Sequence, residues 1–207
     1  MKKKHQSVRS FIKKMLLKMP VLGTHLKLQV IAPHNDSLFS YIFFLLKRDK
    51  SIYWPKTKTN RVINPKNIIL GINSSIGGEG CYIQGNGKLI IGNYVRVATN
   101  VGILSGNHNV LNHLEEIKKT TIIGDYSWIG MNSIILPGVE LGQRTVVAAG
   151  SVVTKSFPDG YCVLAGNPAK KVKDIDKAKF NPVENEFRFY GYIPMDKFEK
   201  FKKKHLL

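Results

Sequence analysis

Two histidines, His108 and His113, lie five residues apart in the segment ILSGNHNVLNH. Histidine is a common metal ligand, and its ordinary pKa also suits it to take up and return a proton near neutral pH. A catalytic zinc site needs three protein ligands and a water. No third histidine occurs between His34 and His108, and the only one after His113 is His205. The spacing therefore leaves three interpretations open: a metal ligand, a general base or an ordinary loop residue.

The chain around these histidines repeats with a period of six residues. From Ile123 it divides into IGDYSW, IGMNSI, ILPGVE, LGQRTV, VAAGSV and VTKSFP, and from Ile91 the same frame gives IGNYVR, VATNVG and ILSGNH. The first position is aliphatic in all nine hexads, and the second is mostly Gly or Ala. Six is not a multiple of 3.6, so no helical stripe results. A parallel β-helix explains the pattern, with a short strand and a turn in each hexad and three hexads in each coil.

Hexads of this type resemble those of the hexapeptide-repeat acyltransferases. Four segments carry a closer resemblance, in this order: GCYIQGNGKLIIGNYVRVATNVGILSGNHN, SWIGMNSIILPGVELG, AAGSVVTKSFP and AGNPAKKV. They look like the branch that includes the maltose, galactoside and nodulation-factor O-acetyltransferases, above all members that modify surface polysaccharides. The resemblance covers residues 52–175. It implies a left-handed β-helix, a homotrimer, acetyl-CoA as co-substrate and a sugar or oligosaccharide acceptor.

The fold class that we predict is an all-β core, a left-handed parallel β-helix with helical additions. It has a basic N-terminal helical extension (1–60), a catalytic β-helix (61–170) and a C-terminal tail (171–207). Complete coils are expected from Ile91 to His108 and twice from Ile123 to Pro158, after a looser coil around 66–90. Helices are expected over much of 7–19, over 36–48 and around 195–204. The polar segment 109–121 breaks the frame, so it should loop out from the coil, where such insertions often form the binding face.

The net charge of +18 lies mostly at the two ends of the chain. Residues 1–65 hold 14 Lys or Arg against 2 Asp or Glu, whereas residues 66–165 hold 7 against 6. Basic ends suit nucleic acid, an anionic membrane surface or anionic ligands, or they are simply a solvated surface. No basic motif interleaved with aromatics, zinc finger or helix-turn-helix pattern is present, so we expect no nucleic-acid partner. A basic amphipathic segment at 8–22 is expected to pack on the body of the protein, with contact to an anionic membrane surface as the alternative.

The location that we expect is cytoplasmic, with the inner face of the membrane as the alternative. The opening MKKKHQSVRSFIKKMLLKM is interrupted by lysines, so we expect no cleaved signal. Cys81 and Cys162 lie far apart and form no spaced framework, which fits a reducing compartment and two buried thiols. We expect no metal.

The resemblance assigns the role of general base to His108. Acyl transfer from a thioester to a hydroxyl needs a base within hydrogen-bond reach, and in these acetyltransferases a histidine at the start of the loop supplies it. Relatives carry Asp after that histidine, where this chain has Asn109. Glu115, Glu116 or a neighbouring subunit is left as the source of a carboxylate. His113 either contacts the acceptor or the subunit interface, or has no role.

The resemblance also implies where the donor and the acceptor bind. Acetyl-CoA would lie in the groove between adjacent coils, with any contact at Met131 made by the backbone. The implied donor contacts are Gly130, Met131, Ala149, Thr154, Lys155, Lys170 and Lys173. Lys170 and Lys173 would face the adenosine phosphate or are solvated lysines. The acceptor-side candidates are Gln84, Asn86, Asn109, His113 and Trp128, the last of which alternatively packs in a trimer interface.

The function that we predict is acetyl-CoA-dependent O-acetyl transfer to a sugar hydroxyl, in surface polysaccharide synthesis. Transfer should be direct, since no activated Ser or Cys nucleophile is apparent. An N-acetyltransferase acting on an amino sugar is the nearest alternative. A γ-class carbonic anhydrase shares the β-helix and has two zinc-binding histidines in this spacing, but it needs a third. A non-catalytic scaffold that binds polyanion or membrane is the remaining alternative.

Overall fold

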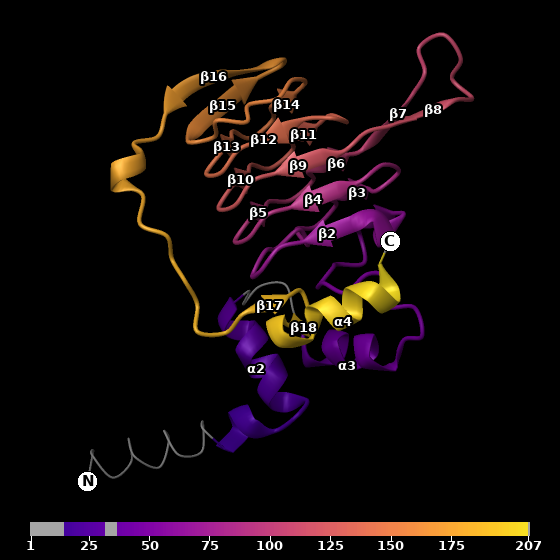
Figure 1. The fold of residues 1–207 in the computed structure, drawn as a ribbon, viewed down its shortest axis with the longest axis vertical. Coiled ribbons are helices and arrows are strands. Elements are labelled where there is room, and N and C mark those ends of the chain that lie inside the picture. Colours follow the sequence, from indigo (N-terminus) through magenta and orange to yellow (C-terminus); the bar gives the residue numbers. More distant parts are fainter. Residues whose placement is uncertain (1–14, 32–36, 207) are drawn as a thin grey trace.

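A stack of about five β-helix coils forms the body of the molecule (Figure 1). The computed structural model describes residues 15–31 and 37–206. The coils contribute their strands to three parallel sheets, and β16 adds an antiparallel edge strand to the third. Sheet A contains β1 (Arg61–Ile63), β3 (Tyr82–Gln84), β6 (Gly102–Leu104), β11 (Ile134–Ile135) and β14 (Val152–Val153). Sheet B contains β2 (Ile68–Leu70), β4 (Leu89–Ile91), β9 (Thr121–Ile123) and β12 (Glu140–Leu141). Sheet C contains β5 (Arg96–Val97), β10 (Trp128–Ile129), β13 (Val146–Val147), β15 (Cys162–Gly166) and β16 (Ala169–Asp174).

The first residue of every hexad fills the axis of the coil. All nine are buried, each with at most 6% of its surface exposed. Parallel pairing stacks them in register, so that Ile103 lies beside Ile135 and Ile135 beside Val153. The period of six is therefore the period of an aliphatic column, and the predicted left-handed parallel β-helix is confirmed.

The fourth residue of most hexads turns the chain from one sheet to the next. Its backbone is left-handed at seven positions: Tyr94, Asn100, Tyr126, Asn132, Gly138, Arg144 and Gly150. The polar residue that follows is often a small buried hydroxyl, such as Ser133, whose Oγ donates to the carbonyl of Gly130. Where such a hydroxyl is present, it pairs a backbone carbonyl that the turn would otherwise leave unsatisfied.

The hexad that ends at His108 does not turn. Its fourth residue, Gly106, has no positive φ, so the chain runs straight out as β7 (Gly106–His108). β7 pairs antiparallel with β8 (Glu116–Lys118), and His108 lies opposite Glu116. The coil predicted to end at His108 therefore ends at Ser105, and His108 belongs to a hairpin that projects from the corner between sheets A and B (Figure 1). The predicted insertion at 109–121 loops out as expected over residues 109–118, whereas Thr121 already belongs to β9 of the coil and is buried.

The described N-terminal and C-terminal segments form one cap at the first coil (Figure 1). The cap contains α2 (Leu22–Ile31), α3 (Leu38–Leu46), α4 (Met195–His205), and the short strands β17 (Phe189–Tyr190) and β18 (Ile193–Pro194). Tyr53 links it to the coil, because its hydroxyl accepts from the N–H of Leu70 over 2.8 Å and its ring contacts Phe198 and Phe201. The helices predicted at 36–48 and 195–204 are confirmed as α3 and α4. Within the predicted helix at 7–19, residues 15–18 are helical and residues 7–14 lie outside the described residues.

Residues 175–188 connect the last coil to the cap, and we call them the strap. The strap includes the short helix η2 (Lys177–Lys179) and descends along the corner between sheets B and C (Figure 1). A second short helix, η1 (Pro65–Asn67), lies between β1 and β2. None of the described helices is long and apolar enough to cross a bilayer.

Candidate active site

His108 ends β7, at the root of the projecting hairpin. Its side chain is exposed, and its backbone N–H donates to Asn107 Oδ1 over 2.9 Å. Its ring Nδ1 lies 2.6 Å from the backbone carbonyl oxygen of His113. The hairpin thus presents an imidazole to solvent and holds it through one short hydrogen bond.

The partner of this hydrogen bond decides the tautomer of the His108 ring. A carbonyl oxygen only accepts hydrogen bonds, so Nδ1 carries the proton and donates it. In the neutral imidazole the other nitrogen, Nε2, then has a free lone pair. That is the arrangement that a general base requires, with the basic nitrogen directed away from the atom that anchors the ring.

The missing carboxylate is not replaced within the hairpin. Asn109, which stands in the place of the usual Asp, donates from its side chain to Glu115 over 3.0 Å. Glu116 accepts from the side chain of Asn86 over 3.0 Å. Within the described residues neither glutamate hydrogen-bonds the ring of His108, which is oriented by a backbone carbonyl instead.

Gln84 and Asn86, predicted on the acceptor side, hold the root of the hairpin. Gln84 Oε1 accepts from the N–H of Gly106 over 3.1 Å. Asn86 bonds Glu116 on β8, and its Oδ1 accepts from the side chain of Asn64 over 2.8 Å. Their acceptor-binding role stays a prediction, and the structure gives both a positioning role.

The predicted donor contacts lie at two corners on either side of sheet A. Gly130, Met131 and Ala149 occupy the corner between sheets C and A, whereas Thr154 and Lys155 follow β14 at the corner between sheets A and B. A Cβ on Gly130 would lie 2.7 Å from the backbone nitrogen of Ala149, so adjacent coils touch closely there. Met131 and Ala149 are exposed, which leaves this corner accessible to a long, thin ligand.

The predicted phosphate lysines are exposed on β16. Among the described residues neither Lys170 nor Lys173 forms an ion pair, whereas Lys171 lies 2.8 Å from Asp174. Free ammonium groups at these two positions fit the expected contact with an anionic group.

Trp128 lies on another side of the coil from His108, on the outer face of sheet C. Its side chain is 55% exposed and lines a cavity of about 1110 Å³ between sheet C, the strap and the end of α2. Among the described residues no hydrogen bond joins His108 to Trp128 or to any predicted donor contact. One chain therefore holds His108 and Trp128 on different sides of the coil, whereas Gln84, Asn86, Asn109 and His113 lie with His108 at the hairpin.

The two cysteines are buried in the coil, Cys81 with 1% and Cys162 with 2% of its surface exposed. Burial raises the pKa of both thiols. A protonated, inaccessible thiol is a poor nucleophile. Within the described part of the chain, no three His, Cys, Asp or Glu side chains gather to hold a metal ion.

The comparison with protein families matches residues 120–155 to the bacterial transferase hexapeptide (six repeats). Residues 120–155 therefore carry hexapeptide repeats of this kind. The repeats of the family occupy β9 to β14, where the nine-hexad frame is most regular. The chain is 32% identical over 118 residues to galactoside O-acetyltransferase from Lactococcus lactis, a match that covers 52% of this chain and 56% of that protein.

Two further similarities concern a different acceptor and the whole fold. Over 65 residues the chain is 51% identical to 2,3,4,5-tetrahydropyridine-2,6-dicarboxylate N-acetyltransferase from Clostridium perfringens, covering 31% of this chain and 27% of that protein. The crystal structure of a maltose O-acetyltransferase from Clostridium difficile aligns with a TM-score of 0.57 and 26% identity, over 76% of this chain and 89% of that chain. A galactoside acetyltransferase in complex with coenzyme A, at 23% identity and the same TM-score, shares the fold over 82% of this chain and 89% of that chain. The chain spans about half the length, or less, of the curated relatives it matches.

Proposed function

We propose that the protein is an acetyl-CoA-dependent O-acetyltransferase that acts on a sugar hydroxyl. The observation that carries the proposal is the His108 ring at the hairpin root, with Nδ1 held by a carbonyl and Nε2 free. The galactoside and maltose O-acetyltransferases to which the chain is similar support a sugar acceptor. The solved complex with coenzyme A supports acetyl-CoA as the donor.

The reaction proceeds in one complex of donor and acceptor. His108 Nε2 takes the proton of the acceptor hydroxyl while its oxygen attacks the thioester carbonyl carbon. The carbon–sulfur bond then breaks, and the thiolate of coenzyme A takes the proton back from the imidazolium. The products are an acetyl ester and coenzyme A. Because both cysteines are buried, no acetyl-cysteine intermediate is required.

Donor binding uses the residues that flank sheet A and the lysines on β16. The backbone at Gly130, Met131 and Ala149 would contact the pantetheine arm, and Thr154 and Lys155 would contact it at the second corner. Lys170 and Lys173 would meet the phosphates of the adenosine end, where their charges are not neutralised by a neighbouring carboxylate.

A trimer completes the site in this proposal. The tip of the hairpin exposes Val110, Leu111 and Leu114, which are 97%, 95% and 84% exposed. Three large aliphatic side chains on a projecting arm favour an interface. Packing of the arm on a neighbouring chain would bring His108 to donor and acceptor residues that its own chain holds elsewhere.

The biological setting is proposed with the function. We propose that the enzyme is cytoplasmic and acts in the synthesis of a surface polysaccharide. We also propose that the basic segment 8–22 makes peripheral contact with an anionic membrane. Exposed Phe39, Phe43 and Leu46 on α3, beside Lys47 and Arg48, support a surface of this kind on the cap.

An N-acetyltransferase is the second candidate, favoured by the 51% identity to an N-acetyltransferase over 65 residues. A His base serves an amine acceptor as well as a hydroxyl, so the geometry at His108 does not separate the two. The acceptor decides between them.

The test is a thiol-release assay with acetyl-CoA against a panel of monosaccharides, oligosaccharides, nucleotide sugars and amino sugars. The proposal predicts thiol release with sugars that carry only hydroxyl groups, and mass spectrometry should find an alkali-labile acetyl ester. Release with amino sugars alone, giving an alkali-stable amide, would establish the second candidate. No release with any acceptor, from a protein that retains its fold, would contradict both.

A further inference from the structure

The corner between sheets B and C carries large side chains where a β-helix turn favours small ones. Each coil has a non-glycine residue with a left-handed backbone there: Asn73, Tyr94, Tyr126, Arg144 and Tyr161, the last of which follows the left-handed Gly160. The corner between sheets C and A makes the same turn with Gly80, Asn100, Asn132 and Gly150. Left-handed backbone costs a residue with a large side chain about 1–2 kcal/mol. The large side chains of the B/C corner therefore need a role that offsets this cost.

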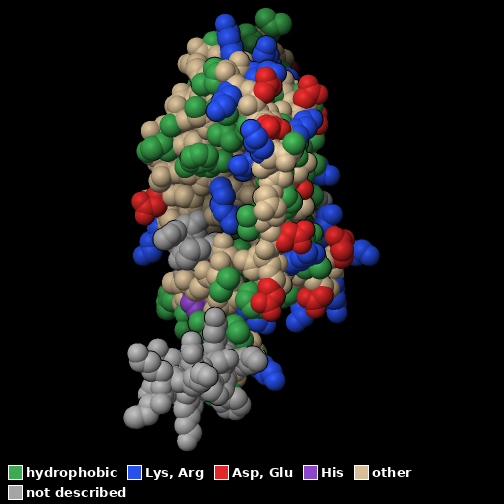
Figure 2. All heavy atoms as spheres, turned by 90° about the vertical axis from the view of Figure 1, so that its left-hand side faces the viewer, with side chains coloured by type: hydrophobic (Ala, Val, Ile, Leu, Met, Phe, Trp, Pro, Cys, Tyr) green, Lys and Arg blue, Asp and Glu red, His purple; other side chains and the backbone are tan. Residues whose placement is uncertain are grey.

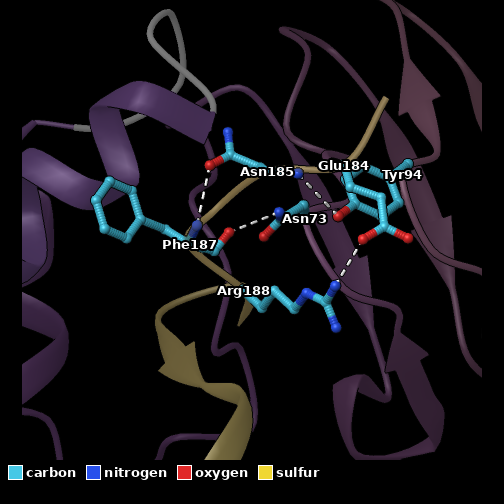
Figure 3. A network of polar contacts seen from close by, with 6 residues as sticks. All are labelled: Asn73, Tyr94, Glu184, Asn185, Phe187 and Arg188. Carbon is cyan, nitrogen blue, oxygen red and sulfur yellow. Dashed lines mark hydrogen bonds and ion pairs between the residues drawn. The ribbon is translucent and has the colours of Figure 1, made fainter. Parts of the chain in front are cut away.

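Part of that role is to hold the strap. Figure 3 shows Asn73 donating to the carbonyl of Phe187, and the N–H of Asn185 donating to the hydroxyl of Tyr94. Arg188 pairs with Glu184 within the strap over 2.7 Å. These contacts fix the lower end of the strap against the first two coils, and they leave the corner above it open as the cavity that Trp128 lines.

The upper part of the cavity combines aromatic rings with the guanidinium of Arg144. Lys173, already a candidate for the donor phosphates, and the carboxylates Asp174 and Asp176 line the same cavity. Tyr94 and Tyr126 are stacked with ring centroids 5.0 Å apart, and Phe180 of the strap packs edge-on to Tyr126. Arg144 lies over the Phe180 ring at 5.1 Å. Its Nε is buried and lacks a hydrogen-bond partner among the described residues. The Arg144 side chain also lines the cavity, and no ion pair to it is found among the described residues, so its charge can meet an anionic ligand there.

A second guanidinium lies lower in the same cavity. Arg96, on β5, donates to the backbone carbonyls of Asn73 and Ile31, and no carboxylate pairs with it among the described residues. Its guanidinium thus faces the first coil, whereas that of Arg144 faces the strap beside the fourth coil. Neighbouring coils are ~4.8 Å apart, so the two charges are spread along the cavity and do not converge on one point.

Figure 2 looks onto this side of the molecule and shows basic, acidic and hydrophobic side chains interspersed over the β-helix. Aromatic rings, side-chain amides and separated cations suit a chain of sugar rings that carries charges at intervals. A nucleoside diphosphate, with adjoining phosphates, would need cations that converge.

We propose that this cavity binds an acidic oligosaccharide, with its sugar rings on Trp128 and the tyrosines and its carboxylates or phosphates on Arg96 and Arg144. The inference rests on the proposed function, since it gives the charge class of the acceptor. It also predicts that the acceptor oligosaccharide lies along the strap of one subunit, on another side of the coil from the His108 of that subunit.

The test measures binding without acetyl-CoA. Trp128 is exposed and Trp54 is 2% exposed, so tryptophan fluorescence reports mainly on the cavity. Tetragalacturonate, maltotetraose and UDP are the probes. We expect tetragalacturonate to change the fluorescence and to bind at least tenfold more tightly than the other two, with an affinity that falls as salt is added.

Two variants identify the cations. Arg144→Asn keeps a residue suited to the left-handed backbone, and Arg96→Gln removes the second charge. Each should weaken tetragalacturonate binding about tenfold, and the two losses should multiply, because the sites are separate. Arg61→Gln, which changes an exposed arginine on β1 outside the cavity, should have no effect.

Three results would overturn the inference: equal binding of maltotetraose, tighter binding of UDP that depends on Arg144, or unchanged tetragalacturonate affinity in both cavity variants. Failure of the proposed function looks different. In that case tetragalacturonate still binds, and no sugar is acetylated. Acetylation of sugars by a protein that does not bind tetragalacturonate would refute the cavity inference alone.

Discussion

At the scale of single residues, one backbone oxygen explains how His108 is oriented without the expected acidic neighbour. The carbonyl of His113 accepts a hydrogen bond from Nδ1 and so fixes the tautomer of the ring, as an Asp would. Unlike an Asp, it adds no negative charge. An imidazolium formed during the reaction is therefore stabilised less than it would be beside a carboxylate. The side chain of His113 is exposed and takes no part in this contact.

The two buried cysteines give a second prediction at the scale of single residues. Burial raises the pKa of Cys81 and Cys162, so both thiols stay protonated and shielded in the folded protein. A thiol reagent at mildly alkaline pH should therefore react slowly with the native protein, and with both cysteines rapidly after denaturation. The measurement is colorimetric titration before and after unfolding. Rapid reaction of one thiol in the native protein, with loss of transfer activity, would support a covalent intermediate.

His108 could be predicted from the sequence because it stands where the hexad frame breaks. Its partner could not, because a hydrogen bond to a backbone carbonyl leaves no trace in residue types. Arg96 and Arg144 were missed for a related reason: both are ordinary outward residues of a repeat. The signal that identifies Arg144 is its place at the fourth hexad position, where Asn or Gly would be expected.

At the scale of elements, the period of six predicted the aliphatic columns correctly, and the corners depend on the backbone. Gly124 and Gly102 make a matched pair. A Cβ on Gly124 would lie 2.5 Å from the carbonyl carbon of Gly142 in the next coil, whereas a Cβ on Gly102 would lie 3.6 Å from the flexible side chain of Ile134.

Gly124→Ala should therefore destabilise the protein by about 1–3 kcal/mol, since two backbones would have to move apart. Gly102→Ala should be neutral or slightly stabilising, because it lowers the entropy of the unfolded chain. Thermal unfolding of the two variants beside the unaltered protein measures the difference. Equal losses in both would mean that the coils are not packed as closely as described.

The helix α2 shows where element prediction from sequence fails. It contains Gly23, Thr24, Val30 and Ile31, which are weak helix formers. A Cβ on Gly23 would lie 2.3 Å from the carbonyl oxygen of Leu17, so the preceding turn packs directly on it. Tertiary packing stabilises this helix against its local propensity, and a pattern in one sequence does not report such packing.

At the scale of the whole molecule, the strap is the feature that sequence reasoning could not place. It carries the chain from the last coil back to the first, where Asn73 bonds to residues more than 100 positions away. Contacts of that separation have no periodic signal. Through these contacts the described N-terminal and C-terminal segments pack together as one cap. The strap then bounds one side of the cavity that Trp128 lines.

The proposed trimer makes a prediction at this scale. The described chain leaves Leu111 and Leu114 in water at the tip of the hairpin, so Leu111→Glu with Leu114→Glu should disrupt an interface there. Light scattering should give about three times the 23.3 kDa chain mass for the unaltered protein and close to one chain for the double variant. Transfer activity should fall with it, because each site needs two chains.

The control for that experiment is Val172→Glu, which changes a 62% exposed valine on β16 away from the hairpin. It should leave the mass unchanged. A monomeric unaltered protein, or a double variant that keeps its trimer, would contradict the proposed assembly.

The central claim is that His108 is the base and that His113 serves it only through its carbonyl. The most direct measurement compares kcat at saturating acceptor and acetyl-CoA for His108→Ala and His113→Ala, with both folds checked by circular dichroism. We expect a loss of about 10²–10⁴-fold for His108→Ala and a kcat within about threefold for His113→Ala, because the carbonyl remains. Near-normal turnover by His108→Ala, or an equally large loss in His113→Ala, would contradict it.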